Sequence, residues 1–533
     1  MGRRRIALVL LAVGLGGCGA AEPVPKPPPP PEVIGPERQG ELKAASWRAA
    51  AAAEARRLAR LRAAIRKARR TPTVAGALRL ALLTGRLTPR AHARLTREYA
   101  AARGAAGRLT GARAVELGSV LATVDSLAAQ RLLTASRLRP VFLVLRRNTY
   151  FWTHAAMPAA AYRTTFGRDP AVFQYYPGRG MQLQPLASWG KVNWQAGECM
   201  RARAKARRRA ACPVAALRRN VDRLLGLAAN RGAGFPAWEH YFSWGGGSPP
   251  WISGMTQATA ISALARASRA LDEPRWRRAA HRGLAAFDTP PPVGVDGGDH
   301  FLMYSFAPGL RIFNGELQAV SGIGELAALG RDRHARRLFR RGERTTRAMV
   351  AAADTGAWSL YSWAGRESTL GYHQLIEEFL GDMCLRTQRR TYCSARRRFA
   401  RYEREPTRIG ISPLRRLKAR HATTVRFSLS KVSAVTVRVW SDKGLNMTRS
   451  LQLPYGDHTV AWTPPARGRF RLRIAAQGPS GPLGVATRRL RVILPKPEPK
   501  PKPKKQCTTR RAPERECSKE LLTPRPEPAK VDR

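Results

Sequence analysis

Tyrosine hydroxyls and histidine rings are the side chains of this sequence best suited to chemistry, and they gather between residues 145 and 405. Tyr304, Tyr361, Tyr372 and His373 stand there among many arginines. A phenol with an ordinary pKa near 10 becomes a useful base or acid at neutral pH only where neighbouring cations lower that pKa. Paired carboxylates are scarce, and no Ser/His/Asp order, phosphate loop, dinucleotide fingerprint or zinc-ligand spacing stands in a credible context. Tyrosines and histidines among many arginines are therefore the most conspicuous candidates for chemistry in this region.

Three similar segments must position these residues. They begin at Gly254, Gly315 and Gly371, each ends in Gln three residues later, and their spacing is 61 and then 56 residues. Each opens an apolar helix that is followed by a short turn and an Arg-rich amphipathic helix, and a looser copy starts at Gly180. This pairing predicts a mainly α chain with the inner and outer helices of an α/α toroid (an incomplete α/α barrel); chance similarity in a helix-rich sequence is the alternative. The loops entering the inner helices would share one rim, where free N–H groups and positive helix ends suit a carboxylate-bearing ligand.

The same region resembles a known family at several motifs. The motifs are Phe173–Ala187, Pro250–Gln257, Asn314–Gly315, Asp354–Tyr361 and Gly371–His373. They resemble the C-terminal domain of D-glucuronyl C5-epimerases, from about Tyr150 to Pro406. That family converts D-glucuronate to L-iduronate in heparosan-type polysaccharides without a cofactor. A base removes the proton at C5, and an acid returns a proton on the opposite face.

The resemblance implies roles for individual residues. Tyr304 and Tyr372 match the two opposing catalytic tyrosines, Tyr361 matches a third active-site tyrosine, and His373 is expected to support them. An arginine beside the uronate carboxylate would stabilise the enolate-like intermediate. The candidate substrate-binding residues lie in or beside the same motifs: Tyr175, Tyr176, Arg179, Gln182, Gln184, Trp251, Gln257, Arg311, Asn314 and Arg366.

Three positions depart from the family pattern. Met303 stands where the animal enzymes have Glu, Ile376 replaces a second His, and Ile252 replaces a Tyr. We therefore weigh three functions. The first is a uronyl C5-epimerase-like protein acting on a uronate-containing polysaccharide. The second is a catalytically silent glycan-binding protein, which these losses favour, and the third is a polysaccharide lyase, whose first step is the same proton abstraction.

The flanking segments predict export and attachment to a membrane. Arg3–Arg5 and the apolar stretch Ile6–Leu15 lead to Cys18 in a pattern that resembles a bacterial lipoprotein signal over residues 1–18; an ordinary signal peptide is the alternative. Lipidated Cys18 would hold the protein on the outer face of the cell membrane. The remaining divisions are a Pro-rich linker over 19–37, a helical region over 38–144, the epimerase-like domain over 145–408, an immunoglobulin-like β-sandwich over 415–494 and a disordered Pro/Lys-rich tail over 495–533. The sandwich carries no cluster of polar aromatic residues, so we expect it to be dispensable for chemistry.

The cysteines predict disulfides, and the net charge indicates the class of partner. The other six cysteines form close pairs, which predicts local disulfides in an exported chain, with reduced buried thiols as the alternative: Cys199 with Cys212, Cys384 with Cys393, and Cys507 with Cys517. The formal net charge of +59 favours a polyanionic partner, although arginine is abundant throughout. Because an exported protein rarely meets nucleic acid, we expect an acidic polysaccharide or the anionic cell envelope as the partner, and no nucleic acid.

Overall fold

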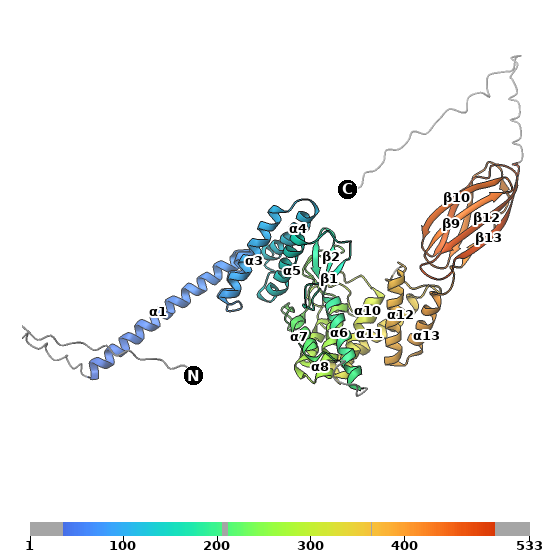
Figure 1. Cartoon of the computed structure of the whole chain (residues 1–533). Coiled ribbons are helices and arrows are strands. Elements are labelled where there is room, and N and C mark those ends of the chain that lie inside the picture. Colours follow the sequence, from blue (N-terminus) through green and yellow to red (C-terminus); the bar gives the residue numbers. More distant parts are fainter. Residues whose placement is uncertain (1–35, 205–211, 364, 496–533) are drawn as a thin grey trace, which may run out of the picture. The chain divides into compact units, whose positions relative to one another are not determined.

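The computed structural model describes residues 36–204, 212–363 and 365–495, which contain thirteen α-helices followed by a strand-rich C-terminal part (Figure 1). The predicted signal peptide with Cys18, nearly all of the linker, and the tail with Cys507 and Cys517 lie outside these residues. The chain divides into two compact units, one of residues up to Arg103 with Val124–Ala135 and one of Gly104–Thr123 with residues from Ser136 onward. Among the described helices, none is long and apolar enough to cross a membrane.

The first unit begins with the long helix α1 (Pro36–Arg70), which packs on α2 (Val74–Leu83). Residues 43–63 of α1 are exposed, as expected for a solvated polar helix. Helix α2 begins after Thr73, whose hydroxyl accepts a hydrogen bond from the Gly76 N–H, and it buries one apolar face. The next helices are α3 (Pro89–Arg108), α4 (Gly111–Ala129) and α5 (Ala135–His154).

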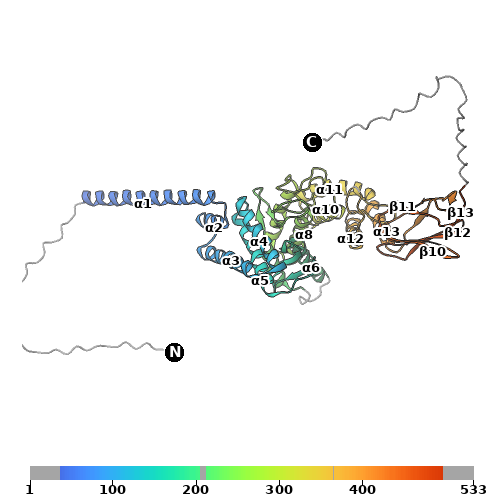
Figure 2. The same ribbon diagram turned by 90° about the horizontal axis from the view of Figure 1, so that it is seen from above.

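Four helical hairpins form the centre of the second unit (Figure 2). Their helices are α6 (Pro185–Ala204) with α7 (Val214–Leu225), α8 (Gly254–Leu271) with α9 (Pro274–Gly283), α10 (Phe313–Leu329) with α11 (Arg333–Ala352), and α12 (Leu370–Thr387) with α13 (Arg390–Tyr402). The first helices pack on one another in the order α6, α8, α10, α12, and each also packs on its own partner. The predicted repeat thus corresponds to the starts of α8, α10 and α12. Gly180 is an exception, because it opens a strand and not a helix.

Side-chain size and polarity separate the two kinds of helix. Nearly all of α8 is buried, and α10 approaches it so closely that a Cβ on Gly322 would lie 2.6 Å from the Ala258 carbonyl oxygen. The second helices are amphipathic: α11 buries Leu338, Thr346 and Met349 and exposes its arginines. The mainly α architecture is therefore confirmed, whereas closure of the hairpins into a toroid stays a prediction.

A small antiparallel sheet precedes these hairpins. It consists of β1 (Arg163–Thr165), β2 (Val172–Tyr176) and β3 (Gly180–Leu183). The buried Glu116 carboxylate of α4 accepts hydrogen bonds from the Tyr175 hydroxyl at 2.8 Å and from the Gly178 and Gly180 amides at 2.8 and 2.7 Å. On the other side, Asn148 of α5 bonds both the amide and the carbonyl of Met181. The β2–β3 hairpin is thus held at its turn by buried polar side chains.

The C-terminal strands form two sheets that share one apolar core. The larger sheet has the order β10–β9–β12–β13–β7, and the smaller has the order β11–β8–β6. The strands are β6 (Ile409–Ile411), β7 (Leu417–Lys418), β8 (Thr423–Leu429), β9 (Ser433–Ser441), β10 (Gly444–Leu453), β11 (Gly456–Trp462), β12 (Gly468–Gln477) and β13 (Gly484–Ile493). Val437, Leu472 and Ile474 of one sheet and Val425 and Phe427 of the other lie in that core. One further pair, β4 (Ala229–Asn230) with β5 (Pro236–Ala237), lies between α7 and α8 in the sequence.

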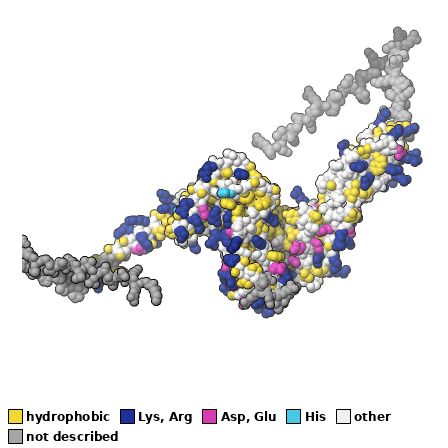
Figure 3. Space-filling view, viewed as in Figure 1, with side chains coloured by type: hydrophobic (Ala, Val, Ile, Leu, Met, Phe, Trp, Pro, Cys, Tyr) yellow, Lys and Arg dark blue, Asp and Glu magenta, His cyan; other side chains and the backbone are white. Residues whose placement is uncertain are grey.

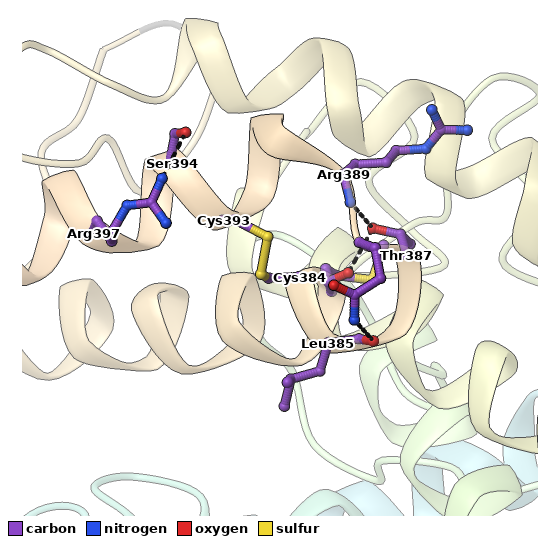
Figure 4. Close-up of a disulfide and its surroundings, with 9 residues drawn as sticks. Cys384, Leu385, Thr387, Arg389, Cys393, Ser394 and Arg397 are labelled. Carbon is purple, nitrogen blue, oxygen red and sulfur yellow. Dashed lines mark hydrogen bonds between the residues drawn. A yellow bond between two sulfur atoms is a disulfide. The ribbon is translucent and has the colours of Figure 1, made fainter.

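Two cysteine pairs form disulfides within helical hairpins. Cys199 and Cys212 have Cα atoms 4.7 Å apart, and Cys384 and Cys393 have Cα atoms 4.8 Å apart. Figure 4 shows the second bond linking α12 to α13 across their short turn, where the Arg389 amide also donates to the Thr387 hydroxyl. Both bridges join neighbours in the sequence, so each fixes a local turn of the fold.

Two glutamates of α10 experience opposite environments. Burial raises the pKa of Glu316 to about 8, and its carboxylate accepts the Phe301 amide at 2.8 Å. The pKa of Glu325 is lowered despite its burial, because hydrogen bonds and ion pairs with Arg266 and Arg386 favour the charged form. The two side chains therefore make opposite contributions to stability as pH changes.

Glu316→Gln should stabilise the fold at alkaline pH. The raised pKa of Glu316 means that its folding advantage is present below about pH 4.5 and is lost as pH rises to about 8. Removing the buried charge should therefore raise the free energy of unfolding by roughly 3–5 kcal/mol at pH 8.5 and change it little at pH 4.5. Denaturant unfolding across that pH range measures both values.

Glu325→Gln on the same helix is the matched control. The lowered pKa of Glu325 gives stability above its unfolded-state pKa, so this variant should be destabilised at neutral pH and should approach the wild type as pH falls. Parallel pH profiles for the two variants would contradict the assignment of opposite environments.

Candidate active site

Three tyrosines expected to act on substrate come together from separate segments. Tyr304 lies in the loop before α10, Tyr361 in the loop before α12, and Tyr372 in the first turn of α12. The Tyr361 hydroxyl lies near enough to the hydroxyls of Tyr304 and Tyr372 for both to affect its pKa, and the ring centroids of Tyr361 and Tyr372 are 4.7 Å apart. Tyr176 of β2 interacts electrostatically with Tyr304 and Tyr372. These four residues form what we call the tyrosine cluster.

The Tyr304 hydroxyl accepts a hydrogen bond from Trp244 Nε1 at 3.4 Å, and the Tyr361 hydroxyl lies nearby. Burial raises the pKa of Tyr304 above its ordinary value, whereas Trp244 and Tyr361 act to lower that pKa. Donors aimed at a phenol oxygen stabilise its phenolate. The two neighbours of Tyr304 therefore offset part of the effect of burial on its pKa.

The environment of Tyr361 differs from that of Tyr304. Burial raises its pKa well above the ordinary value, and the neighbouring Tyr304 and Tyr372 hydroxyls raise it further. A phenol in that environment stays protonated at neutral pH and serves as a hydrogen-bond donor. Tyr372 is 41% exposed, so its hydroxyl is the one of the three with direct access to solvent.

Aromatic packing fixes the ring of Tyr304. The ring stacks on Phe306 at 5.3 Å and meets the edge of Trp251 at 5.5 Å. Trp251 in turn stacks on the buried His240 ring at 4.0 Å and donates from Nε1 to the Phe242 carbonyl at 2.7 Å. The Tyr304 hydroxyl is thus presented from a packed aromatic wall.

A glycine turn positions Trp244 over that hydroxyl. Trp244 and Gly247 exchange backbone hydrogen bonds of 3.0 and 2.8 Å, and Gly245 and Gly246 have φ values of 52° and 84°. A Cβ on Gly247 would lie 2.3 Å from the ring of Phe306, so a larger residue cannot occupy this position without a shift of that ring. The turn brings the indole N–H within reach of Tyr304.

The Asp-Thr-Gly motif aims Tyr361 and does no chemistry itself. The Asp354 carboxylate accepts hydrogen bonds from the Gly356 amide at 2.9 Å, the Tyr402 hydroxyl at 3.0 Å and Arg398 Nε at 2.9 Å. Gly356 has a φ of 81°, as a tight turn requires. Beyond the turn, the Tyr361 carbonyl accepts the Phe313 amide at 3.1 Å, which ties the loop to the start of α10.

The C-terminal sandwich holds the far end of the same loop. Glu367 accepts the backbone amides of Val432 and Tyr455, both at 2.7 Å. Lys431 donates to the Tyr402 and Glu405 carbonyls at 2.6 and 2.8 Å and lies 5.2 Å from the Trp358 ring centroid. Residues of the sandwich thus bind the loop that carries Tyr361, and the expectation that the sandwich is dispensable for chemistry stays a prediction.

His373 lies apart from the tyrosine cluster. Its ring is fully buried, stacks on Trp358 at 3.8 Å, and uses Nδ1 with the Ser359 hydroxyl and Nε2 with the Phe399 carbonyl. Burial lowers the pKa of His373 to about 4, so the ring is neutral at physiological pH. Because both nitrogens are occupied within the fold, the geometry gives His373 a positioning role for the Tyr361 loop and not a proton-carrying one.

The predicted substrate-binding residues separate into two groups. Tyr176 and Gln184 lie at the cluster, where Gln184 Nε2 donates to the Tyr176 hydroxyl at 2.9 Å, and Trp251 packs behind Tyr304. The others that are buried support the fold: Tyr175 bonds Glu116, Gln182 bonds the Arg179 carbonyl and Gln257 bonds the Trp238 carbonyl. Buried oxygens without a protein partner remain on Gln182, Gln184, Gln257 and Asn314.

The arginines named from the sequence do not surround the phenols. Arg311 pairs with Asp299 at 2.8 Å and lies over the Trp363 ring, and Arg366 is exposed. Among the described residues, no arginine contributes to the pKa shift of Tyr304. Arg163 of β1, which sequence reasoning missed, lowers the pKa of Tyr176 against the larger effect of burial. Trp244 was also missed, and its only signal is the run of three glycines that follows it.

The family departures have a common structural setting. Ile252 and Ile376 are fully buried. Met303 lies against Gly315, where a Cβ would be 2.9 Å from its Sδ, and its sulfur is 3.9 Å from the Ser253 hydroxyl. Apolar side chains thus fill all three places.

Among the described residues, no group of three His, Cys, Asp or Glu side chains could hold a metal ion.

Glu367→Ala tests whether the sandwich controls the Tyr361 loop. The change leaves two amides without their carboxylate acceptor, at a cost of about 1–3 kcal/mol in unfolding free energy. If Tyr361 takes part in catalysis, we expect turnover to fall about tenfold or more, since a small displacement of a catalytic group has effects of this size.

Glu377→Ala, which removes a surface ion pair with Arg396, is the control and should keep wild-type turnover. If thermal melting shows that both proteins are folded and Glu367→Ala has the turnover of the wild type, the loop does not need the sandwich.

Comparisons with known proteins agree with the motifs. Residues 234–401 match the family model described as D-glucuronyl C5-epimerase C-terminus. No match was found among curated proteins. Among solved structures, the chain is similar to cellobiose 2-epimerase from Spirochaeta thermophila DSM 6192, with 19% identity, a TM-score of 0.33, and coverage of 54% of this chain and 72% of that one. The family match confirms the resemblance seen in the sequence over residues 234–401, which are similar to the D-glucuronyl C5-epimerase C-terminus.

Proposed function

We propose that this protein is a uronyl C5-epimerase that uses the tyrosine cluster to exchange the C5 proton of a uronate residue in a polysaccharide. The observation that carries the proposal is the meeting of three phenols from separate segments: Tyr304 and Tyr361 affect each other's pKa, Tyr372 affects both, and the Tyr361 and Tyr372 rings lie 4.7 Å apart. Neighbouring phenols can take up and return protons at one sugar ring, which supports transfer in either direction. The family match over residues 234–401 supports a carbohydrate epimerase-like role.

The proposed reaction breaks and re-forms one C–H bond. Tyr304, as phenolate, takes the C5 proton, and the electron pair passes into the uronate carboxylate as an enolate. Trp244 stabilises the Tyr304 phenolate by a hydrogen bond of 3.4 Å, and the nearby Tyr361 hydroxyl favours the same charged form. Tyr372 then donates its hydroxyl proton to C5 from the other face and regains a proton from solvent, while Tyr304 releases the C5 proton to solvent and returns to the phenolate. No oxidant or reductant enters the balance.

The carboxylate of the substrate needs a positive partner. Arg163 is the cation whose influence reaches the cluster, through Tyr176. The start of α12 lies at Tyr372, where Thr369 caps the helix, and the helix dipole adds a positive end there. We further propose that the four hairpins form the open arc of an α/α toroid, so that the starts of α8, α10 and α12 share the rim that holds this site.

We also propose an exported, lipid-anchored setting. The support is the sequence alone: Arg3–Arg5, the short apolar stretch after them and Cys18. A uronate polymer of the cell envelope, of the heparosan type, is the substrate class that this setting and the net charge of +59 favour.

Cys18→Ser should abolish acyl labelling and membrane retention in cells. The sulfur of Cys18 is the proposed point of lipid attachment, and serine lacks that sulfur. Metabolic labelling with a fatty-acid probe and membrane fractionation measure both. Labelling that persists in the variant would remove Cys18 from the account.

Tyr304→Phe and Tyr372→Phe should each lower the rate of epimerisation by roughly 10²–10⁴, the usual contribution of a general acid or base. Each change removes one proton carrier and keeps the ring packing. The ratio of iduronate to glucuronate in heparosan, followed by proton NMR, measures the rate.

Tyr162→Phe is the control, because this tyrosine is 45% exposed and lies outside the cluster. Rates within twofold of wild type in all three variants would refute the tyrosine assignment. An unsaturated, ultraviolet-absorbing product would favour the lyase, and tight binding without turnover would favour the silent glycan-binding protein.

A further inference from the structure

The outer face of the larger C-terminal sheet carries a concentration of positive charge. Along β12, exposed or half-buried arginines alternate with buried Phe470, Leu472 and Ile474, so the arginines point away from the core. The same alternation in β9 and β13 brings further arginines to that face. We call this set the arginine face: Arg438, Arg469, Arg471, Arg473, Arg489 and Arg491.

The strand register places like charges directly opposite one another. Arg469 pairs with Arg491, Arg471 with Arg489, and Arg473 with Arg438. Side chains paired in this way lie about 5 Å apart at Cβ, and directly opposed like charges destabilise a sheet. Three such pairs in neighbouring strands therefore cost the free protein stability, which favours a selected role for the face over incidental arginine content.

The arginine face also lacks compensating acids. Residues 409–494 contain sixteen Lys and Arg but only two acidic residues, Asp442 and Asp457. Among the described residues, none of the six arginines lies within ion-pair distance of a carboxylate, whereas helical arginines such as Arg398 and Arg341 are paired with Asp354 and Asp296. Figure 3 shows Lys and Arg side chains along the sandwich with very few acids among them.

One aromatic residue lies within the row. Trp440 of β9 is opposite Arg471 in the register and is half-buried on the same face. An indole offers a flat apolar surface beside the guanidinium groups, and such a pairing suits a ligand with alternating apolar ring faces and negative groups.

We propose that the arginine face binds a linear acidic polysaccharide. The occupant follows from charge complementarity and from Trp440. The choice of a glycan over other polyanions rests on the proposed function, because the same chain would then process a uronate polymer. Rows of cations about 5 Å apart across the strands and about 7 Å apart along them match an extended polyanion better than a small anion.

The test measures binding of the full chain to fluorescein-labelled heparosan by anisotropy between 50 and 300 mM NaCl. The variant replaces Arg469, Arg471 and Arg489 with Ser. The matched control replaces Arg336, Arg337 and Arg340 of α11 with Ser, which removes the same charge from three exposed arginines. We expect the face variant to bind at least about tenfold more weakly and to lose roughly 2–3 from its log–log salt slope, with the control within about threefold of wild type.

Equal losses of heparosan binding in the two variants would overturn the proposal, because binding would then depend on the net charge of the protein and not on the arginine face. Tighter binding of single-stranded DNA or phosphatidylglycerol vesicles than of heparosan would overturn the glycan assignment. The face variant should melt at the same or a higher temperature than wild type, since it relieves opposed charges. If it does not fold, Arg471→Ser should still weaken binding and Arg471→Lys should restore it; no rescue would count against the proposal.

The proposed binding surface and the proposed reaction can be rejected independently of each other. Tyr304→Phe should bind heparosan as wild type does while its turnover falls. Binding that depends on the arginine face in a wild type without turnover would reject the proposed function and keep the surface. Turnover by the wild type, with equal binding of heparosan by wild type and face variant, would keep the proposed function and reject the binding surface.

Discussion

The grouping of the Tyr304, Tyr361 and Tyr372 phenols is the constraint on which the rest of the site depends. Burial costs the phenols of Tyr304 and Tyr361 hydration, so the group persists only if three separate segments, two loops and the start of α12, hold it in place. The packing around each segment meets this requirement: an aromatic wall behind Tyr304, a carboxylate turn before Tyr361 and a capped helix start at Tyr372.

Parts of the chain outside the matched family segment supply much of this positioning. Glu116 and Asn148, which precede it, fix the hairpin that carries Tyr176. Lys431, Val432 and Tyr455, which follow it, fix the loop that carries Tyr361. Residues 234–401 are thus only the central part of a larger arrangement, and the flanking regions act through buried hydrogen bonds.

The sequence was most informative where local pattern decides structure. The repeated Gly and Gln positions correspond to the starts of α8, α10 and α12, and strands β7 to β13 lie within the range predicted for the sandwich. The edge strand β10 is mostly exposed and shows no clear alternation, so local pattern does not mark it. Gly180 was assigned to a helix start although it has a φ of 75° and opens β3.

Local motifs also identified some of the site residues and missed those that reach the site through tertiary contacts. The motifs identified the three tyrosines, but nothing local distinguishes His373 as a buried ring between Trp358 and Phe399. Trp244 and Arg163 reach the cluster only through tertiary contacts, which spacing does not encode. The arginines expected beside the phenols are instead engaged or exposed, since the abundance of arginine in this sequence hides which of them face the site.

Solvent deuterium at C5 is the most direct measure of the central claim. Wild-type protein and heparosan are incubated in deuterated water, and the uronate residues are examined by NMR and mass spectrometry. The account predicts deuterium at C5 of both glucuronate and newly formed iduronate, with no unsaturated product. Protium retained at C5 in every uronate of a polymer that the protein binds would contradict it.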